Sequence, residues 1–240
     1  MDKRLTRCSV VILGAFVLCG NAFAQWATQT VNLHAGWNAI FLELEPYPQQ
    51  CEFQLEGLPI LSVWTCDQVS SPMQFIQNPD ELLPEMPEWR YFFPPASPES
   101  FATNLRDFQA GRCYLIRTSQ AATWNIIGKP KLTQQRWKPD SYNLVGCYVD
   151  ETAPPTLATW FSGSPAHTPL DVWEFGADDR WHQITSPTTA SVQRGIAYWV
   201  YCKGASDYQG PVTVNLSGED ILTYQRLTTQ KQVEVSHNAL

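Results

Sequence analysis

The sequence contains few of the residues from which metal sites and redox centres are built. Among 240 residues there are only four histidines, and none stands in a His-x-x-x-His or His-Glu-x-x-His spacing. One helix therefore cannot present two imidazoles to a metal ion. A Cys-x-x-Cys pair is also missing, so neither a zinc ribbon nor a thioredoxin-like redox pair is supported. We predict no bound metal and no cofactor.

Clusters of basic residues are absent as well. The chain has 16 Lys and Arg against 23 Asp and Glu, and the basic residues form no run. Nucleic acids and anionic membrane surfaces are bound by clustered cationic side chains that replace counterions. The sequence therefore predicts that neither of them is a partner.

The sequence has no apolar run long enough to span a membrane. Its longest run, Val10 to Gly20, has 11 residues, whereas a span needs about 20. Lys3, Arg4 and Arg7 precede this run, and Ala22-Phe23-Ala24 follows it as a small-x-small cleavage site. We predict that residues 1–24 are a cleaved Sec-type signal peptide, with no membrane span after cleavage. The protein is then secreted, periplasmic or on the surface of a bacterial cell.

Two alternatives stay open for this segment. The apolar run could be retained as an anchor, or Cys19 could be the modified cysteine of a lipoprotein. Against a lipoprotein, Leu18 stands where a small side chain is expected before the cysteine.

Five cysteines follow the predicted cleavage site, at positions 51, 66, 113, 147 and 202. An oxidising compartment makes pairing possible, but an odd number leaves at least one thiol free or bonded to another chain. We favour a disulfide between Cys51 and Cys66, which would close a short loop. The other three are as well explained as small buried hydrophobic residues inside strands.

An internal repeat organises the rest of the chain. Four landmarks recur in the same order, and each contains an aromatic residue. The matched segments are 36–42 with 141–147, 62–64 with 171–173, 88–90 with 180–182, and 111–116 with 195–200.

The repeat predicts a mainly β fold of two diverged tandem β repeats, each a small sandwich or barrel-like module, with one or two short helices. In the first repeat Ile40, Leu42 and Leu44 fall on one face, as in a half-buried strand. The predicted boundaries are 25–130 for repeat 1, with a Pro-rich insertion at about 76–100, 131–218 for repeat 2, and 219–240 for a tail or the start of a further domain.

The order of these motifs resembles a known module. It runs from Gly-Trp-Asn (36–38) through Val-Trp (63–64), Pro-Glu-Trp (87–89) and Gly-x-x-Tyr (111–114) to Trp137–Gly146. Tandem modules of this kind follow the signal peptide of large, mostly uncharacterised secreted bacterial surface proteins. The resemblance covers nearly all of the mature chain. It implies location and architecture and carries over no catalytic residue.

Aromatic residues are plentiful, with ten Trp, nine Tyr and eleven Phe. Those that match between the repeats, such as Tyr114 with Tyr198, are expected to share a packing role. Flat rings on a surface also bind the apolar faces of sugars, and Trp26, Trp137 and Trp160 have no counterpart in the other repeat. We take Trp137, Trp160 and Trp181 as candidate ligand-binding residues.

No motif in the sequence indicates a catalytic centre. The segment closest to a serine-nucleophile elbow is Ser162-Gly163-Ser164-Pro165, where the proline favours a turn, and His167 nearby does not complete the motif. The acidic residues form no pair of the kind that glycoside hydrolysis requires. We predict a secreted, non-enzymatic β module that acts as a structural or interaction domain. The alternatives are a carbohydrate-binding module and a secreted hydrolase; a glycan or another cell-surface protein is a possible partner.

Export makes a first testable prediction. The secreted chain begins at Gln25, as read by N-terminal sequencing of protein expressed with its signal. Ala24→Phe fills the small-residue position and leaves the precursor uncleaved, whereas Phe23→Leu in the tolerant middle position is processed normally. A secreted chain that starts at Met1, or one lipidated at Cys19, contradicts the prediction.

Overall fold

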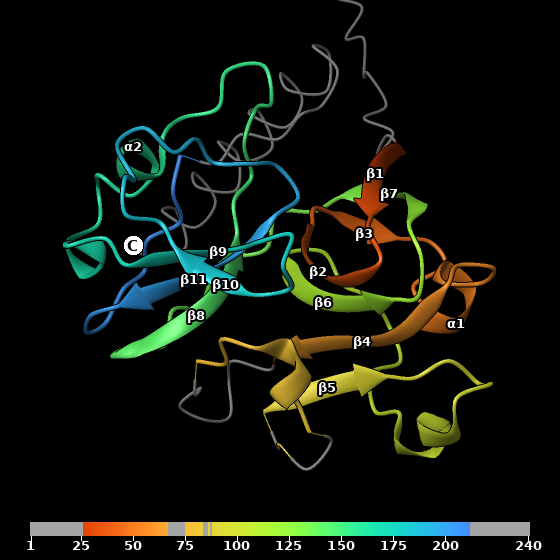
Figure 1. Cartoon of the computed structure of the whole chain (residues 1–240). Coiled ribbons are helices and arrows are strands. Elements are labelled where there is room, and N and C mark those ends of the chain that lie inside the picture. The colour runs from red at the N-terminus through yellow and green to blue at the C-terminus, as the bar shows by residue number, and fades with distance from the viewer. Residues whose placement is uncertain (1–25, 67–74, 84–85, 87, 212–240) are drawn as a thin grey trace, which may run out of the picture.

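The computed structural model describes residues 26–66, 75–83, 86 and 88–211. The predicted signal peptide, the predicted tail and parts of the Pro-rich insertion lie outside the described residues. The fold is mainly β, as the repeat predicts: three antiparallel sheets and only short helices make up the described chain (Figure 1).

Two four-stranded sheets have the same topology, one in each half of the chain. In both sheets the four strands, numbered in chain order, lie side by side in the order first, fourth, second, third. The first sheet contains β2 (Gly36–Leu42), β4 (Ile60–Cys66), β5 (Trp89–Phe92) and β6 (Arg112–Thr118). The second contains β8 (Ser141–Gly146), β9 (Val172–Phe175), β10 (Trp181–Gln183) and β11 (Ala197–Cys202).

The strand register is also the same in the two sheets. Ile40 pairs with Tyr114 in the first sheet, and Val145 pairs with Tyr198 in the second. These four residues are the ones that the sequence repeat aligns. A one-residue slip would move every side chain of a strand to the opposite face. The matched register therefore places matched side chains on matched faces, which confirms the two tandem β repeats.

The Asn of the first landmark has the same task in each repeat. The side-chain oxygen of Asn38 accepts from the backbone N–H of His34 at 2.9 Å, and its amide donates to the His34 carbonyl at 3.0 Å. Asn143 makes the equivalent pair of bonds with Lys138, at 2.8 and 3.1 Å. Each Asn closes the turn that leads into the first strand of its sheet, because its side chain satisfies two backbone groups that the ladder leaves unpaired.

The two sheets face each other across one shared core. Its members come from both halves of the chain and are mostly aromatic or large aliphatic side chains. The central ones are Trp37, Phe41, Trp64, Trp89 and Leu115 from the first half and Leu144, Tyr148, Trp181 and Trp199 from the second. Neither half could bury this face alone, so the two repeats stabilise each other.

The outer face of each four-stranded sheet is covered in a different way. A third sheet of β1 (Ala27–Leu33), β7 (Ala122–Pro130) and β3 (Leu44–Pro46) covers the first half, in the order β1-β7-β3. In the second half α2 (Leu157–Trp160) and the loops around it pack against β8 and β11. The remaining helices are α1 (Cys51–Gln54) and the short 3-10 helices Pro79–Glu81, Pro98–Ala102 and Pro165–His167.

This three-layer arrangement corrects the expectation of half-buried strands. In β2 every residue from Trp37 to Leu42 is buried, because one face meets the second half and the other meets the third sheet. Ile40 and Leu42 do share a face, as predicted. Leu44 belongs to the separate strand β3 rather than to the same strand.

The predicted Cys51–Cys66 disulfide is not formed. Both cysteines are unbonded in the described chain, and they lie in different clusters. Cys51 begins α1 and packs between the first and third sheets, whereas Cys66 ends β4 and packs against the shared core. The first sheet separates the two thiols, which the short sequence separation could not indicate.

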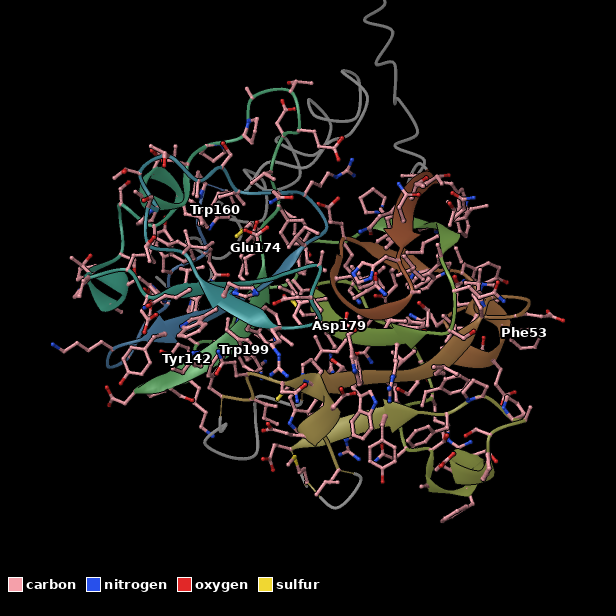
Figure 2. The ribbon with its side chains drawn as sticks, viewed as in Figure 1. Phe53, Tyr142, Trp160, Glu174, Asp179 and Trp199 are labelled. Atoms are coloured by element: carbon pink, nitrogen blue, oxygen red, sulfur yellow. The ribbon has the colours of Figure 1, made fainter. Side chains whose placement is uncertain are left out.

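Backbone contacts join the halves at the edge of the shared core. The N–H of Phe41 donates to the carbonyl of Gly195 at 2.7 Å, and the N–H of Trp37 donates to the carboxylate of Asp179 at 3.0 Å. Asp179 lies where the two halves meet (Figure 2). Gly146 completes the junction, because a Cβ there would lie 1.9 Å from the Phe41 ring.

The junction makes a second prediction. Gly146→Ala lowers the free energy of unfolding by about 1–3 kcal/mol, the range for overpacking a close-packed core. Urea unfolding followed by tryptophan fluorescence measures the loss. Gly163→Ala is the matched control, because its new Cβ would come no nearer than 3.4 Å to the Tyr208 ring. Equal stability of the two variants would contradict the close contact between the halves.

Candidate functional site

The structure buries two of the three candidate tryptophans. Trp160 is 4% exposed and Trp181 is 1% exposed, so neither can present a ring face to a ligand. Trp137 is half-buried, and its indole N–H donates to the carbonyl of Tyr208. Trp160 and Trp181 are therefore corrected from ligand-binding candidates to core residues.

The packing of Trp181 gives the physical reason. Its ring lies 5.0 Å from that of Phe175 and 6.0 Å from that of Trp199, measured between centroids, both edge-on. Trp89, the matched residue in the first repeat, also contacts Trp199 edge-on, with the ring centroids 6.4 Å apart. Edge-to-face rings at these distances attract each other beyond the burial of their surface. The shared packing role predicted for matched aromatics applies to Trp181 as well.

Ser164 and His167 do meet, although the sequence motif did not support a catalytic pair. The Ser164 hydroxyl lies 2.6 Å from Nδ1 of His167, within the turn that forms the 3-10 helix Pro165–His167. Both residues are buried, and the imidazole is enclosed by Trp137, Phe161 and Tyr208. Burial lowers the pKa of His167 to about 4. A neutral imidazole that no substrate can reach stabilises the turn rather than activating a nucleophile.

A cleft of about 600 Å³ lies between the two halves. One wall is β1, from Thr28 to Asn32, together with the middle of β2. The opposite wall is formed by the end of β9 and the loop before β11, at Glu174–Ala177 and Gln193–Ile196. This volume falls within the range of ligand pockets, about 300–1,000 Å³.

A network of polar side chains, Arg194, Glu43 and Gln29, lies at the cleft. Nε of Arg194 lies 2.7 Å from a carboxylate oxygen of Glu43, whose side chain is almost fully buried. Burial raises the pKa of Glu43, and the opposing charge of Arg194 only partly offsets this effect. The side chain of Gln29 donates to the Phe41 carbonyl at 2.8 Å and accepts from the Glu43 N–H at 2.9 Å. These contacts fix β1 against β2.

The acidic residues at the rim are engaged with neighbours. Arg194 also lies 3.8 Å from Glu151, and Gln193 donates to Glu174 at 2.6 Å. Burial raises the pKa of Glu174, which Figure 2 labels near β9 in the second half. The guanidinium of Arg194, the carboxylates of Glu151 and Glu174 and the amide of Gln193 therefore each have a partner within the protein.

The edge of β1 is the most distinctive wall of the cleft. Five consecutive residues, Thr28 to Asn32, line it, although alternate side chains of a strand point to opposite faces. This pattern indicates that the backbone edge itself faces the cleft. Among the described strands β1 pairs only with β7, at its other edge. Unpaired backbone donors and acceptors on such an edge can bind another extended chain.

Other kinds of site find no support in the described residues. They contain no group of three or more His, Cys, Asp or Glu that could hold a metal ion. In the same residues no helix is both long and apolar enough to cross a membrane. No protein-family model, curated protein or solved structure matches this chain. The resemblance to tandem surface-protein modules therefore stays a prediction.

The buried imidazole makes a third prediction, on pH. The folded state keeps His167 neutral down to about pH 4, whereas the unfolded chain binds the proton near pH 6.5. Stability is therefore complete above about pH 6.5 and falls as the pH drops toward 4, by up to roughly 1.4 kcal/mol per pH unit. His167→Phe keeps a ring but removes this slope in urea unfolding measured between pH 4 and 7.

His34→Gln is the control for this experiment, because His34 is exposed. It should keep the pH slope of the natural sequence. A slope that survives in His167→Phe would show that another group is responsible.

Proposed function

We propose that the mature chain is a secreted, non-enzymatic interaction module of a bacterial cell surface or extracellular assembly. In this proposal the double-repeat core is a rigid scaffold, and the cleft between the halves binds an extended segment of a partner protein. The observation that carries the proposal is the open edge of β1 along the cleft wall. Strand addition to such an edge gives affinity through backbone hydrogen bonds and specificity through pockets for alternate side chains.

The pairing of the charged side chains around the cleft supports this reading over the hydrolase alternative. Glu43 and Glu151 both lie against Arg194, and Glu174 accepts from Gln193. Carboxylates held in this way fix the walls of the cleft. The Ser164–His167 pair lies in the core rather than in the cleft, which also favours a structural role.

A peptide library tests the proposal. Twelve-residue random peptides are displayed on phage and selected on the mature chain, and the enriched peptides are then studied by amide hydrogen exchange. We expect a bound peptide to slow exchange in β1, at residues 28–32, because strand addition protects edge amides.

The edge strand β10 serves as the internal control. It lies at the end of the second sheet and belongs to no wall of the cleft, so its exchange should not change. Failure to enrich any peptide above the unselected library, or protection at β10 in place of β1, would contradict the proposal.

A further inference from the structure

We infer that a second binding site, at the outer corner of the third sheet, takes a neutral sugar. The corner is a hollow of about 470 Å³ lined by Trp26, Tyr47, Gln50, Lys129, Glu45 and Gln49. It extends the proposed interaction function by naming a ligand class, and it uses none of the residues that line the cleft. The two proposals can therefore fail separately.

The strand pairing fixes the two aromatic rings in place. Ala27 of β1 and Pro46 of β3 both pair with Gly128 of the central strand β7. Trp26 and Tyr47 are the next residues beyond these pairs, on either side of β7. The N–H of Tyr47 donates to the carbonyl of Ile127 at 3.0 Å. Both rings thus stand on a hydrogen-bonded sheet rather than on a free loop, which favours a preorganised site.

The rings form the two walls of a corner. Their centroids are 5.5 Å apart, and their planes meet at 68°. Trp26 is 49% exposed and Tyr47 is 71% exposed. Such exposure of large aromatic rings that contact each other is the signature of a binding surface rather than of packing. A pyranose ring can lay its apolar face on one ring and its edge against the other.

The comparison of the repeats points to the same two residues. Matched aromatics such as Trp89 and Trp181 are buried in the shared core. Trp26 and Tyr47 have no aromatic counterpart, since the aligned stretches of the second repeat, near residues 129–133 and 150–154, contain no aromatic residue. These two rings therefore do not share the packing role of the matched aromatics, and their exposure places them on the surface.

The polar residues around the rings decide the class of ligand. Nζ of Lys129 lies 5.4 Å from the centroid of the Trp26 ring and covers one of its faces, so a cationic ligand would be repelled. Glu45 stands beside Lys129 in the strand register, so the lining carries one charge of each sign. With one charge of each sign, the corner suits a neutral ligand rich in hydroxyl groups. The exposed amide of Gln50 and the ammonium of Lys129 supply hydrogen-bond donors.

Glu45 also explains why the corner keeps its shape. One carboxylate oxygen accepts from Gln49 at 2.6 Å and lies 3.0 Å from the ammonium of Lys131. The other accepts from the N–H of Ala110 at 2.9 Å. Because three groups hold Glu45, its carboxylate fixes the side chain of Gln49 within the lining of the hollow. A proline-rich peptide fits less well, since such peptides use aromatic rings aligned along a groove.

Retention on polysaccharides tests the inference. The mature chain is passed over insoluble cellulose and chitin, and it is run in native gels containing soluble xylan, glucomannan or, as charged probes, alginate and chitosan. We expect retention by at least one neutral polymer and by neither charged one. Trp26→Ala and Tyr47→Ala should each weaken the retention about ten-fold, through the loss of one stacking surface.

Phe101→Ala is the matched control, because Phe101 is 90% exposed and lies outside the corner. Phe101→Ala should bind the polymers as the natural sequence does. All three variants should unfold at the same denaturant concentration as the natural sequence. The inference is overturned if no neutral polymer retains the chain, if retention survives both corner substitutions, or if only alginate or chitosan is bound. Competition by a proline decamer would assign the corner to a peptide instead.

Discussion

The structure depends on one constraint: the aromatic face of each four-stranded sheet has to be buried against the other sheet. Trp89 and Trp181 each contact Trp199 edge-to-face at the centre of this interface. Trp89 and Trp181 come from the edge strands β5 and β10, and Trp199 comes from the inner strand β11. Because apolar burial is the main favourable term in folding, a single repeat with this face open to water would be poorly stable. The two repeats therefore form one folding unit with a shared core rather than two independently folded domains joined by a linker. The cleft follows from the same contact, since it lies where the loops of the second half meet β1 and β2 of the first.

Much of this fold could be predicted from the sequence, because the repeat carries positional information. The matched landmarks gave the strands and, through residues such as Ile40 and Val145, their equivalent register. They did not show how the sheets pack. The segment from Trp37 to Leu42 is apolar at nearly every position, which is typical of a strand buried on both faces, and the half-buried interpretation overlooked this. Likewise, the spacing of Cys51 and Cys66 says nothing about which face of a sheet each thiol occupies.

The candidate sites were harder to predict than the core, for a physical reason. A tryptophan's tendency to bind a ligand depends on its exposure, and exposure is set by tertiary contacts that local sequence does not contain. Trp160 lacks a counterpart in the other repeat and yet is buried beside Tyr208, whereas Trp26, equally unmatched, is exposed. One sequence signal pointed to the proposed corner: neither Trp26 nor Tyr47 has an aromatic counterpart in the second repeat. That both lie next to residues paired with Gly128 of β7 is visible only in the structure. The cleft had no such signal, because its wall is a backbone edge.

Equilibrium unfolding of residues 25–240 tests the shared core most directly. Heat capacity, tryptophan fluorescence and far-ultraviolet circular dichroism report on different parts of the two halves. The account predicts one coincident transition, with calorimetric and van't Hoff enthalpies that agree, because neither sheet stays folded without the other. Two separate transitions, or a half that remains folded after the other has melted, would contradict it.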